Sequence, residues 1–387
     1  MYRVAYLDHT ARWSGGEVAL FNLLTNLDQT VEPLVVLAED GPLAERLREK
    51  GMDVRIIHLD EKVRNRNRNT INFQVFSSAI KTYLYGKAVG RVLREEKVVC
   101  VHTNSLKSAI YGAVAAKSAG IPLIWHIHDI IEAPYLRKIV AFFMKLLVKY
   151  LPDGVIANSN ATMATLNLSQ ATSKKKTIAY PSYFGQIGRK NEPQLEDKDD
   201  RFIVLLVGRL ADWKGQHILL EAAKSFAKRN VEFWIAGDAL FEADAVYKQQ
   251  LIQYIRENGL FNVKMLGHVN DISQLMSQAD LLVHTSVIPE PFGQVIVEGM
   301  AVGLPVIASN AGGPREIVLN EETGLLIPPG KAERLIEAIQ WMIEHPEERK
   351  EMGEKAMNRV KELFLIEHTV QKITSFYPQV ISGRIKI

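Results

Sequence analysis

The chain has 387 residues, of which 47% are hydrophobic and 24% charged, and its mean hydropathy is near zero. That length exceeds one ordinary hydrophobic core, so two domains of similar size are expected. Cys100 is the single cysteine, which excludes an internal disulfide framework and a four-cysteine zinc site and indicates a reducing, cytoplasmic compartment. No sequence window approaches the roughly 18 apolar residues that span a bilayer, and the first residues are interpreted as a strand rather than a signal peptide.

Charge is distributed unevenly along the chain. Residues 1–195 hold 26 Lys and Arg against 17 Asp and Glu, a net charge of +9, whereas residues 196–387 hold 21 against 27, a net charge of −6. This asymmetry indicates that the first half faces something anionic, such as a membrane surface or an acidic acceptor. An uneven surface without functional consequence is the alternative.

Short apolar runs rich in β-branched residues alternate with longer helical patterns, which predicts an α/β fold with parallel sheets covered by helices. In the first half, strands are predicted over residues 4–7, 33–37, 54–58, 98–101, 123–127 and 154–157. In the second half, they are predicted over residues 202–207, 231–236, 263–266, 281–284 and 305–308. Between the halves, residues 182–200 are polar and contain Pro and Gly, which is typical of a linker.

The first half has two candidate binding motifs at predicted strand ends. Gly15 and Gly16 lie between a strand and a helical pattern, where glycines let a ligand approach a helix N-terminus. An ordinary turn explains them equally well, and they lack the three-glycine dinucleotide fingerprint. His128 follows another strand and can hydrogen-bond a sugar hydroxyl or stabilise charge as a bond breaks. A buried histidine bonded to a carbonyl is the alternative.

In the second half, cations and glycines follow the predicted strands. Arg209 and Lys214 come after the first of them, and together they can neutralise a diphosphate without a metal ion, although solvated cations are the alternative. Gly237 and Val269 follow later strands, as candidates for close approach to a ligand and for contact with a base. Asp197-Lys-Asp199 has the spacing of a metal-binding pair, but its charged linker favours a solvated hinge.

The most informative motif is a pair of acids, Glu290 and Glu298, that brackets a Pro-Phe-Gly step. The glycine permits close backbone approach, and the apolar run from Gln294 to Val302 can begin a helix whose N–H groups face a phosphate. A carboxylate can accept two hydrogen bonds from a cis-diol, so Glu298 inside the helix suits a ribose, while Glu290 in the loop can reach a sugar. The motif predicts a site for a phosphorylated sugar.

Taken together, these motifs resemble the retaining glycosyltransferases of family 4. The resemblance is carried, in chain order, by Gly15-Gly16, His128-Asp129, Gly208-Arg209, Lys214-Gly215, Gly237-Asp238, Glu290 to Glu298, Ala311 to Glu316 and Thr323-Gly324. It implies the GT-B fold, with two Rossmann-like domains facing each other across a cleft. Residues 1–181 would bind the acceptor, residues 182–200 would link the domains, residues 201–365 would bind the nucleotide sugar, and residues 366–387 would return to the first domain as a helical tail.

The resemblance also implies roles for individual residues. Arg209 and Lys214 would hold the donor diphosphate, Glu298 the ribose and Glu290 the donor sugar, with His128 near the reacting sugar. The other residues assigned to donor contact are Gly15, Gly16, Gly237, Val269, Phe292, Gly293, Gln294 and Val295. The implied reaction is transfer of a sugar from a nucleotide diphosphate to an acceptor hydroxyl with retention, with no cofactor and no metal. A UDP-sugar is favoured as donor and a GDP-sugar comes next.

The predicted binding of the acceptor depends on Tyr135–Tyr150, a helical pattern that has a broad apolar face and several lysines. Lys138, Lys145 and Lys149 lie on one side of it, as in a helix that lies on a membrane. Two basic loops in the same half are predicted at Arg64-Asn-Arg66-Asn-Arg68 and Lys174-Lys175-Lys176. The hypothesis is a peripheral contact with the inner membrane leaflet and a lipid-linked or saccharide acceptor in cell-envelope polysaccharide or glycolipid synthesis, with no role for nucleic acid. Burial of the apolar face against the sheet is the alternative.

Two other functions fit the same motifs. A nucleotide-sugar epimerase shares the two-domain plan but needs no acceptor. A non-catalytic nucleotide-sugar binding subunit would bind donor without turning it over.

Overall fold

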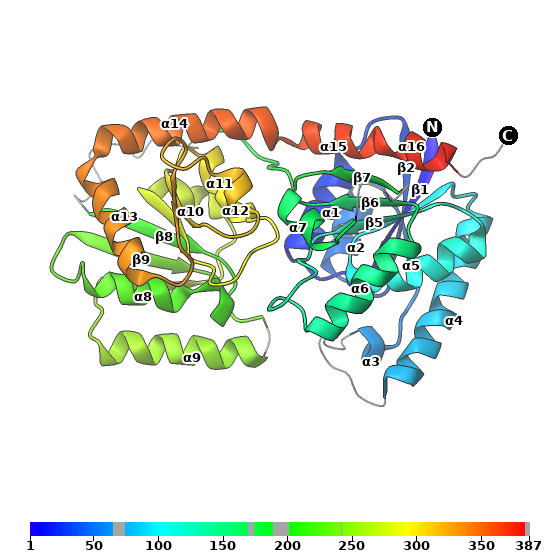
Figure 1. Ribbon diagram of the computed structural model, residues 1–387, viewed down its shortest axis with the longest axis horizontal. Helices are drawn as coiled ribbons and strands as arrows, with labels where there is room; N and C mark the ends of the chain where they lie inside the picture. The colour runs from blue at the N-terminus through cyan, green and yellow to red at the C-terminus, as the bar shows by residue number, and fades with distance from the viewer. Residues whose placement is uncertain (65–73, 169–173, 189–200, 241, 384–387) are drawn as a thin grey trace. The chain divides into compact units, whose positions relative to one another are not determined.

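The computed structural model describes residues 1–64, 74–168, 174–188, 201–240 and 242–383 (Figure 1). The chain divides into two compact units: unit 1 comprises residues 1–182 and 366–387, and unit 2 comprises residues 183–365. Each unit contains a parallel sheet, so the predicted α/β class with two Rossmann-like domains is confirmed. Asp197-Lys-Asp199, Arg66 and Arg68 lie outside the described residues.

Unit 1 is built on a seven-stranded parallel sheet of order β3-β2-β1-β4-β5-β6-β7. The strands are β1 (Tyr2–Asp8), β2 (Val31–Leu37), β3 (Asp53–Ile56), β4 (Cys100–Thr103), β5 (Leu123–Ile127), β6 (Gly154–Ala157) and β7 (Lys175–Ile178). Every residue of β4, β5 and β6 is buried, as expected for central strands covered on both faces. The strand order reverses between β1 and β4, and such a switch point is where open α/β sheets bind ligands at the carboxyl ends of their strands.

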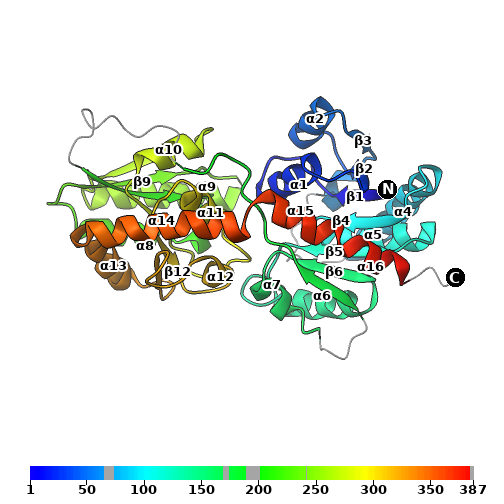
Figure 2. The same cartoon turned by 90° about the horizontal axis from the view of Figure 1, so that it is seen from above.

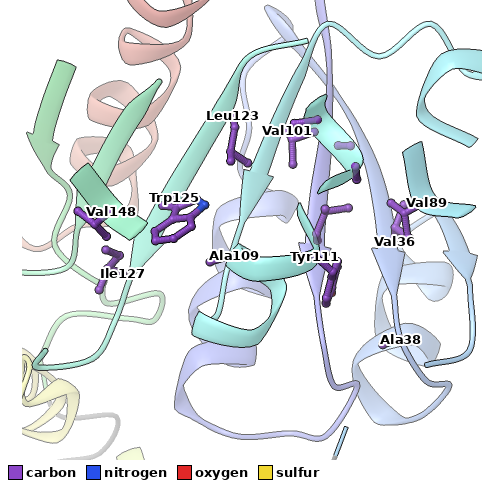
Figure 3. Packing of buried hydrophobic residues seen from close by; sticks show 14 of the residues in the cluster. Val36, Ala38, Val89, Val101, Ala109, Tyr111, Leu123, Trp125, Ile127 and Val148 are labelled. Carbon is purple, nitrogen blue, oxygen red and sulfur yellow. The ribbon is translucent and has the colours of Figure 1, made fainter. Parts of the chain in front are cut away.

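Helices cover both faces of this sheet. One layer contains α4 (Gln74–Glu95), α5 (Leu106–Ala119) and α6 (Lys138–Tyr150), and the other contains α1 (Gly15–Thr25), α2 (Pro42–Glu49), α15 (Ile366–Thr374) and α16 (Phe376–Ser382). The short helices α3 (Glu61–Arg64) and α7 (Asn160–Thr165) complete the unit. Figure 3 shows Trp125 of β5 among buried residues from the first layer. Figure 2 shows α15 and α16, in red, lying over the strands of unit 1.

Unit 2 has a six-stranded parallel sheet of order β10-β9-β8-β11-β12-β13. Its strands are β8 (Phe202–Val207), β9 (Val231–Ala236), β10 (Val263–Gly267), β11 (Leu281–His284), β12 (Val306–Ser309) and β13 (Leu325–Ile327). Its helices are the 3₁₀ helix η1 (Asp212–Lys214), α8 (Gln216–Lys224), α9 (Glu242–Glu257), α10 (Ile272–Gln278), α11 (Gln294–Ala301), α12 (Pro314–Ile317), α13 (Ala332–Glu344) and α14 (Pro346–Leu363). Residues of α8, α9 and α13 share one core with the strands.

The sequence pattern missed two edge strands. β7 reads Lys-Lys-Thr-Ile and β13 has three residues, and neither contains the buried apolar run that marks a central strand. None of the helices within the described residues has the length and apolar character needed to cross a bilayer.

Candidate active site

In unit 2, Glu290 is the centre of a compact charged cluster. Its Oε1 accepts from Lys214 Nζ at 2.5 Å, and its Oε2 lies 2.5 Å from His284 Nε2 and 2.8 Å from the donating Ser286 Oγ. These partners come from two neighbouring strands of the sheet, because Lys214 follows β8 while His284 ends β11. The predicted site residues Lys214 and Glu290 are thus in direct contact.

The cluster keeps Glu290 ionised at neutral pH. Burial by itself raises the pKa of this carboxyl, but the charge of Lys214 and the nearby His284 outweigh burial and hold the pKa far below its usual range. A permanently ionised glutamate cannot act as a general acid near pH 7. Glu290 is instead suited to accept hydrogen bonds and to fix the position of Lys214.

Glycines allow the loops around Glu290 to pack closely. Gly215 has a φ of +73°, and a Cβ there would lie 2.1 Å from the carbonyl oxygen of Thr285. Gly313 donates its N–H to the Glu290 carbonyl at 2.8 Å. A Cβ on Gly312 would lie 2.2 Å from the same oxygen, so no other residue fits there. The Gly-Gly-Pro segment noted in the sequence therefore supports the Glu290 loop.

Arg209 lies beside the same cluster. Its guanidinium carbon is 5.7 Å from the Trp213 ring centroid, and Lys214 Nζ is 4.6 Å from that centroid. Arg209 also faces Asp244 at 3.5 Å. The two predicted phosphate-binding cations therefore share one aromatic side chain, which holds positive charge at the carboxyl end of β8.

Helix α11 begins immediately after this loop. Gly293 precedes it with a φ of +113°, and Gln294 and Val295 form its first turn, where the helix dipole favours an anion. Glu298 lies one turn further and is half-buried. Burial raises the pKa of Glu298 to about 7, although a hydrogen bond with the Gln294 side chain lowers it in part. The two acids of the motif therefore differ: Glu290 is ionised, and Glu298 is divided between its two forms near pH 7.

Three other residues of unit 2 predicted to contact the donor, Gly237, Phe292 and Val269, lie outside the charged cluster around Glu290. A Cβ on Gly237 would lie 1.9 Å from the Gly208 carbonyl oxygen, so this glycine is required for packing of the two strand ends. Phe292 is 3% exposed, and its ring packs 5.9 Å from that of Phe364, which leaves its backbone for any ligand contact. Val269 is half-buried in the loop that follows β10.

Unit 1 contributes a second polar cluster around Asn104. Its Nδ2 donates to Asp8 Oδ2 at 2.7 Å and to the Gly16 carbonyl at 3.2 Å. Its Oδ1 must then accept from His128 Nε2, 3.1 Å away, which fixes the tautomer of this histidine. Gly16 and His128, far apart in sequence, are thereby joined. Apart from their chain neighbours and the backbone of their own helix, Cβ atoms on Gly15 or Gly16 would meet no described atom within 4 Å, so there is room for a ligand beside this backbone.

A buried row of aromatic residues extends from His128 to the C-terminal helix. The His128 and His126 rings are 4.1 Å apart, and His126 Nδ1 lies 3.1 Å from His102 Nε2. His102 Nδ1 is 2.8 Å from the Tyr377 hydroxyl, which is 2.6 Å from that of Tyr6. Burial lowers the pKa of His102 to about 3, so it is neutral at physiological pH.

The sequence pattern missed several of these polar residues. Asp8, Asn104 and His284 each end or follow a buried strand, and that position was the one available signal. Glu17 is buried in the first turn of α1 beside Ser14, and burial together with the charge of Asp8 raises its pKa to about 7. In the described parts of the chain, no three His, Cys, Asp or Glu residues are grouped to hold a metal ion.

Two glycosyltransferase families match this chain. The family described as Glycosyltransferase Family 4 matches residues 13–180, and Glycosyl transferases group 1 matches residues 188–359. The α-D-kanosaminyltransferase of Streptomyces kanamyceticus is 32% identical over 68% of this chain and 73% of its own length. The chain therefore belongs to the glycosyltransferases, with the GT-B fold.

Full-length similarities agree with this assignment. HepE from Anabaena, solved in complex with UDP-glucose, superposes with a TM-score of 0.83 and 27% identity, covering 98% of this chain and all of that chain. The Escherichia coli UDP-Gal:α-D-GlcNAc-diphosphoundecaprenol α-1,3-galactosyltransferase is 26% identical over 94% of this chain and 92% of its own length. The protein is thus an enzyme that transfers a glycosyl group.

Proposed function

We propose that this glycosyltransferase uses a UDP-sugar and transfers the sugar to an acceptor hydroxyl with retention of anomeric configuration. The observation that carries the proposal is the Lys214–Glu290–His284 cluster beside the start of α11, with Glu298 one turn along. The similarity to HepE, solved with UDP-glucose, and to the E. coli galactosyltransferase supports UDP as the nucleotide. A GDP-sugar is the next candidate.

The donor contacts follow from charge. Arg209, Lys214 and the N-terminal end of α11 stabilise the negative charge that develops on the leaving UDP, so the proposed reaction uses no metal. Glu298 accepts from the ribose hydroxyls, while Glu290 accepts from a hydroxyl of the transferred sugar and keeps Lys214 in place. In this arrangement the two acids position the donor, and neither is the nucleophile.

Retention requires the acceptor hydroxyl to approach the anomeric carbon from the same face of the sugar ring from which the leaving group departs. The bond between the anomeric carbon and the diphosphate oxygen breaks, and a bond from that carbon to the acceptor oxygen forms. The acceptor proton passes to the departing diphosphate oxygen. His128, with its proton held on Nε2 by Asn104, offers Nδ1 as a hydrogen-bond acceptor to a sugar hydroxyl.

For the acceptor, we infer a saccharide or a lipid-linked saccharide used in cell-envelope polysaccharide or glycolipid synthesis. The support is the name of the E. coli relative, whose acceptor is carried on diphosphoundecaprenol. The cationic character of the first half of the chain fits such a diphosphate-bearing acceptor.

The experiment has two stages. A thermal-shift screen of UDP-, GDP- and ADP-sugars identifies the donor, because a ligand raises apparent stability by RT ln(1 + [L]/Kd). NMR of the product made with a saccharide acceptor then gives the anomeric configuration, which we expect to match that of the donor. Inversion would contradict the proposed mechanism. An isomerised sugar formed without acceptor would indicate an epimerase, and donor binding without turnover would indicate a binding subunit.

A further inference from the structure

Helix α6 of unit 1 has apolar residues on two opposite faces. Its inner face packs Ala141, Met144 and Val148 into the core, as the burial alternative predicts. Its outer face nevertheless exposes an apolar stripe, which consists of Ile139, Phe142, Phe143, Leu146 and Tyr150, each 43% to 67% exposed. Neither burial nor solvation alone therefore accounts for this helix, because a solvated outer face would be polar.

Lysines flank the stripe. At about 100° per residue, Lys138, Lys145 and Lys149 lie along one edge, between the exposed stripe and the buried face. The nearest acids along the chain are Glu132, which pairs with Lys145 at 3.3 Å, and Asp153, and none lies between them. Large apolar side chains pointing outward with lysines beside them are typical of a helix that lies in a membrane interface.

A second exposed apolar group belongs to the same layer of unit 1. Ile80, Tyr83 and Leu84 of α4 are 48% to 60% exposed, and the inner faces of α4 and α6 both pack into the core beneath them. Figure 1 shows α6 on the outside of unit 1. With 13 residues, α6 is roughly 20 Å long, which is too short to cross a hydrocarbon core of about 30 Å.

We propose that the outer faces of α6 and α4 dock unit 1 on an anionic lipid surface, with the apolar stripe in the interface and the lysines on the lipid phosphates. The net charge of this surface favours lipid over a second copy of the chain. Residues 133–152, which carry the stripe, are cationic and contain no Asp or Glu, so they would attract anionic lipid and repel the same surface of another copy. This inference rests on the proposed function only in taking the acceptor to be lipid-linked.

Flotation of the full chain with vesicles tests the surface. We expect binding to phosphatidylcholine vesicles that contain phosphatidylglycerol and weaker binding to phosphatidylcholine alone. Phe142→Ser with Phe143→Ser should lower binding to both by about tenfold or more, because two apolar anchors are lost. Replacing Lys138, Lys145 and Lys149 by Gln should lower binding to the anionic vesicles alone and remove its dependence on salt.

Matched controls come from unit 2. Phe261 is 97% exposed there, so Phe261→Ser removes an exposed aromatic residue of the same kind and should float like the wild-type chain. Failure of the wild-type chain to float, or equal flotation of the α6 and Phe261 variants, would overturn the proposal. Concentration-dependent dimers that Phe142→Ser abolishes, with no vesicle binding, would assign the stripe to a second copy instead.

UDP-dependent thermal stabilisation separates this proposal from the proposed function. All these variants should keep this stabilisation, because their residues are exposed or, for Lys145, partly exposed, and all lie outside the Lys214–Glu290–His284 cluster. If vesicle binding fails while UDP stabilises the chain, the docking surface alone is wrong. If flotation behaves as expected but no UDP-sugar stabilises the chain or releases UDP, the proposed function alone is wrong.

Discussion

At Lys214, one ammonium group contacts the Glu290 carboxylate and faces the ring of Trp213. We expect Lys214→Ala to lower kcat/KM by about 10²- to 10³-fold, the usual loss when one preorganised donor is removed from a developing negative charge. Lys214→Arg keeps the charge in a bulkier planar group, so it should recover part of that loss. Steady-state release of UDP measures all three rates.

Lys264 provides the control for loss of an ion pair. Lys264 lies on the edge strand β10, and its Nζ is 2.8 Å from a carboxylate oxygen of Glu232 on β9. Lys264→Ala should therefore turn over at the wild-type rate. If both alanine variants lost activity equally, the effect would belong to stability rather than to the donor cluster.

The raised pKa of Glu298 predicts how the free energy of unfolding depends on pH. In the folded chain, burial raises this pKa to about 7, whereas a glutamate in the unfolded chain titrates near pH ~4.3. Between these values the unfolded chain releases this proton and the folded chain retains it, so the free energy of unfolding falls as pH rises. Above about pH 7 both states have released it, and the contribution becomes constant.

Glu298→Gln should therefore flatten the decline of Tm between about pH 5 and about pH 7. Glu17→Gln in unit 1 should do the same, since burial also raises the pKa of Glu17 to about 7. Thermal unfolding across this range measures both, with Glu354→Gln on the exposed face of α14 as control. Unchanged slopes in the first two variants would show that neither carboxyl retains its proton on folding.

At the scale of elements, one hydroxyl of helix α16 contacts two central strands of the sheet of unit 1. The buried Tyr377 hydroxyl contacts both Tyr6 of β1 and His102 of β4. Tyr377→Phe leaves two buried polar groups without this partner, which should cost about 1–3 kcal/mol of unfolding free energy. Because Tyr6→Phe removes one of the same bonds, the double variant should lose less than the sum. Urea unfolding of all four chains tests this, and strict additivity would contradict it.

The sequence predicted central strands well and polar clusters poorly. Central strands are recognisable because each is a continuous apolar run, whereas β7 and β13 lie at sheet edges and lack that run. Lys214 and Glu290, which the sequence assigns to one site because each lies in a motif with glycines, are in direct contact, and their roles toward a ligand stay predictions. Asn104 was missed because a single amide after a strand has no local pattern. Its role depends on contacts with residues about 24 and 88 positions away.

At the scale of the whole molecule, the C-terminal helices belong to unit 1, although the chain reaches them only after completing unit 2. Ile373, Phe376 and Tyr377 are buried against the sheet of unit 1. Ending the chain at Leu365 would expose that core face to water, so unit 1 should lose its cooperative unfolding transition. Unit 2 has its own core and should keep a transition.

The truncated chain also tests which unit binds the nucleotide. Arg209, Lys214, Glu290 and Glu298 all lie in unit 2, so UDP at 100 times its Kd should stabilise the remaining transition by about 2.7 kcal/mol. Calorimetry of the full and truncated chains, each with UDP and with uridine, measures this difference. Uridine lacks the diphosphate and should stabilise far less, because the cations and the start of α11 then have no anion to bind. If UDP stabilised the full chain but left the Tm of the remaining transition unchanged, nucleotide binding would require unit 1 as well.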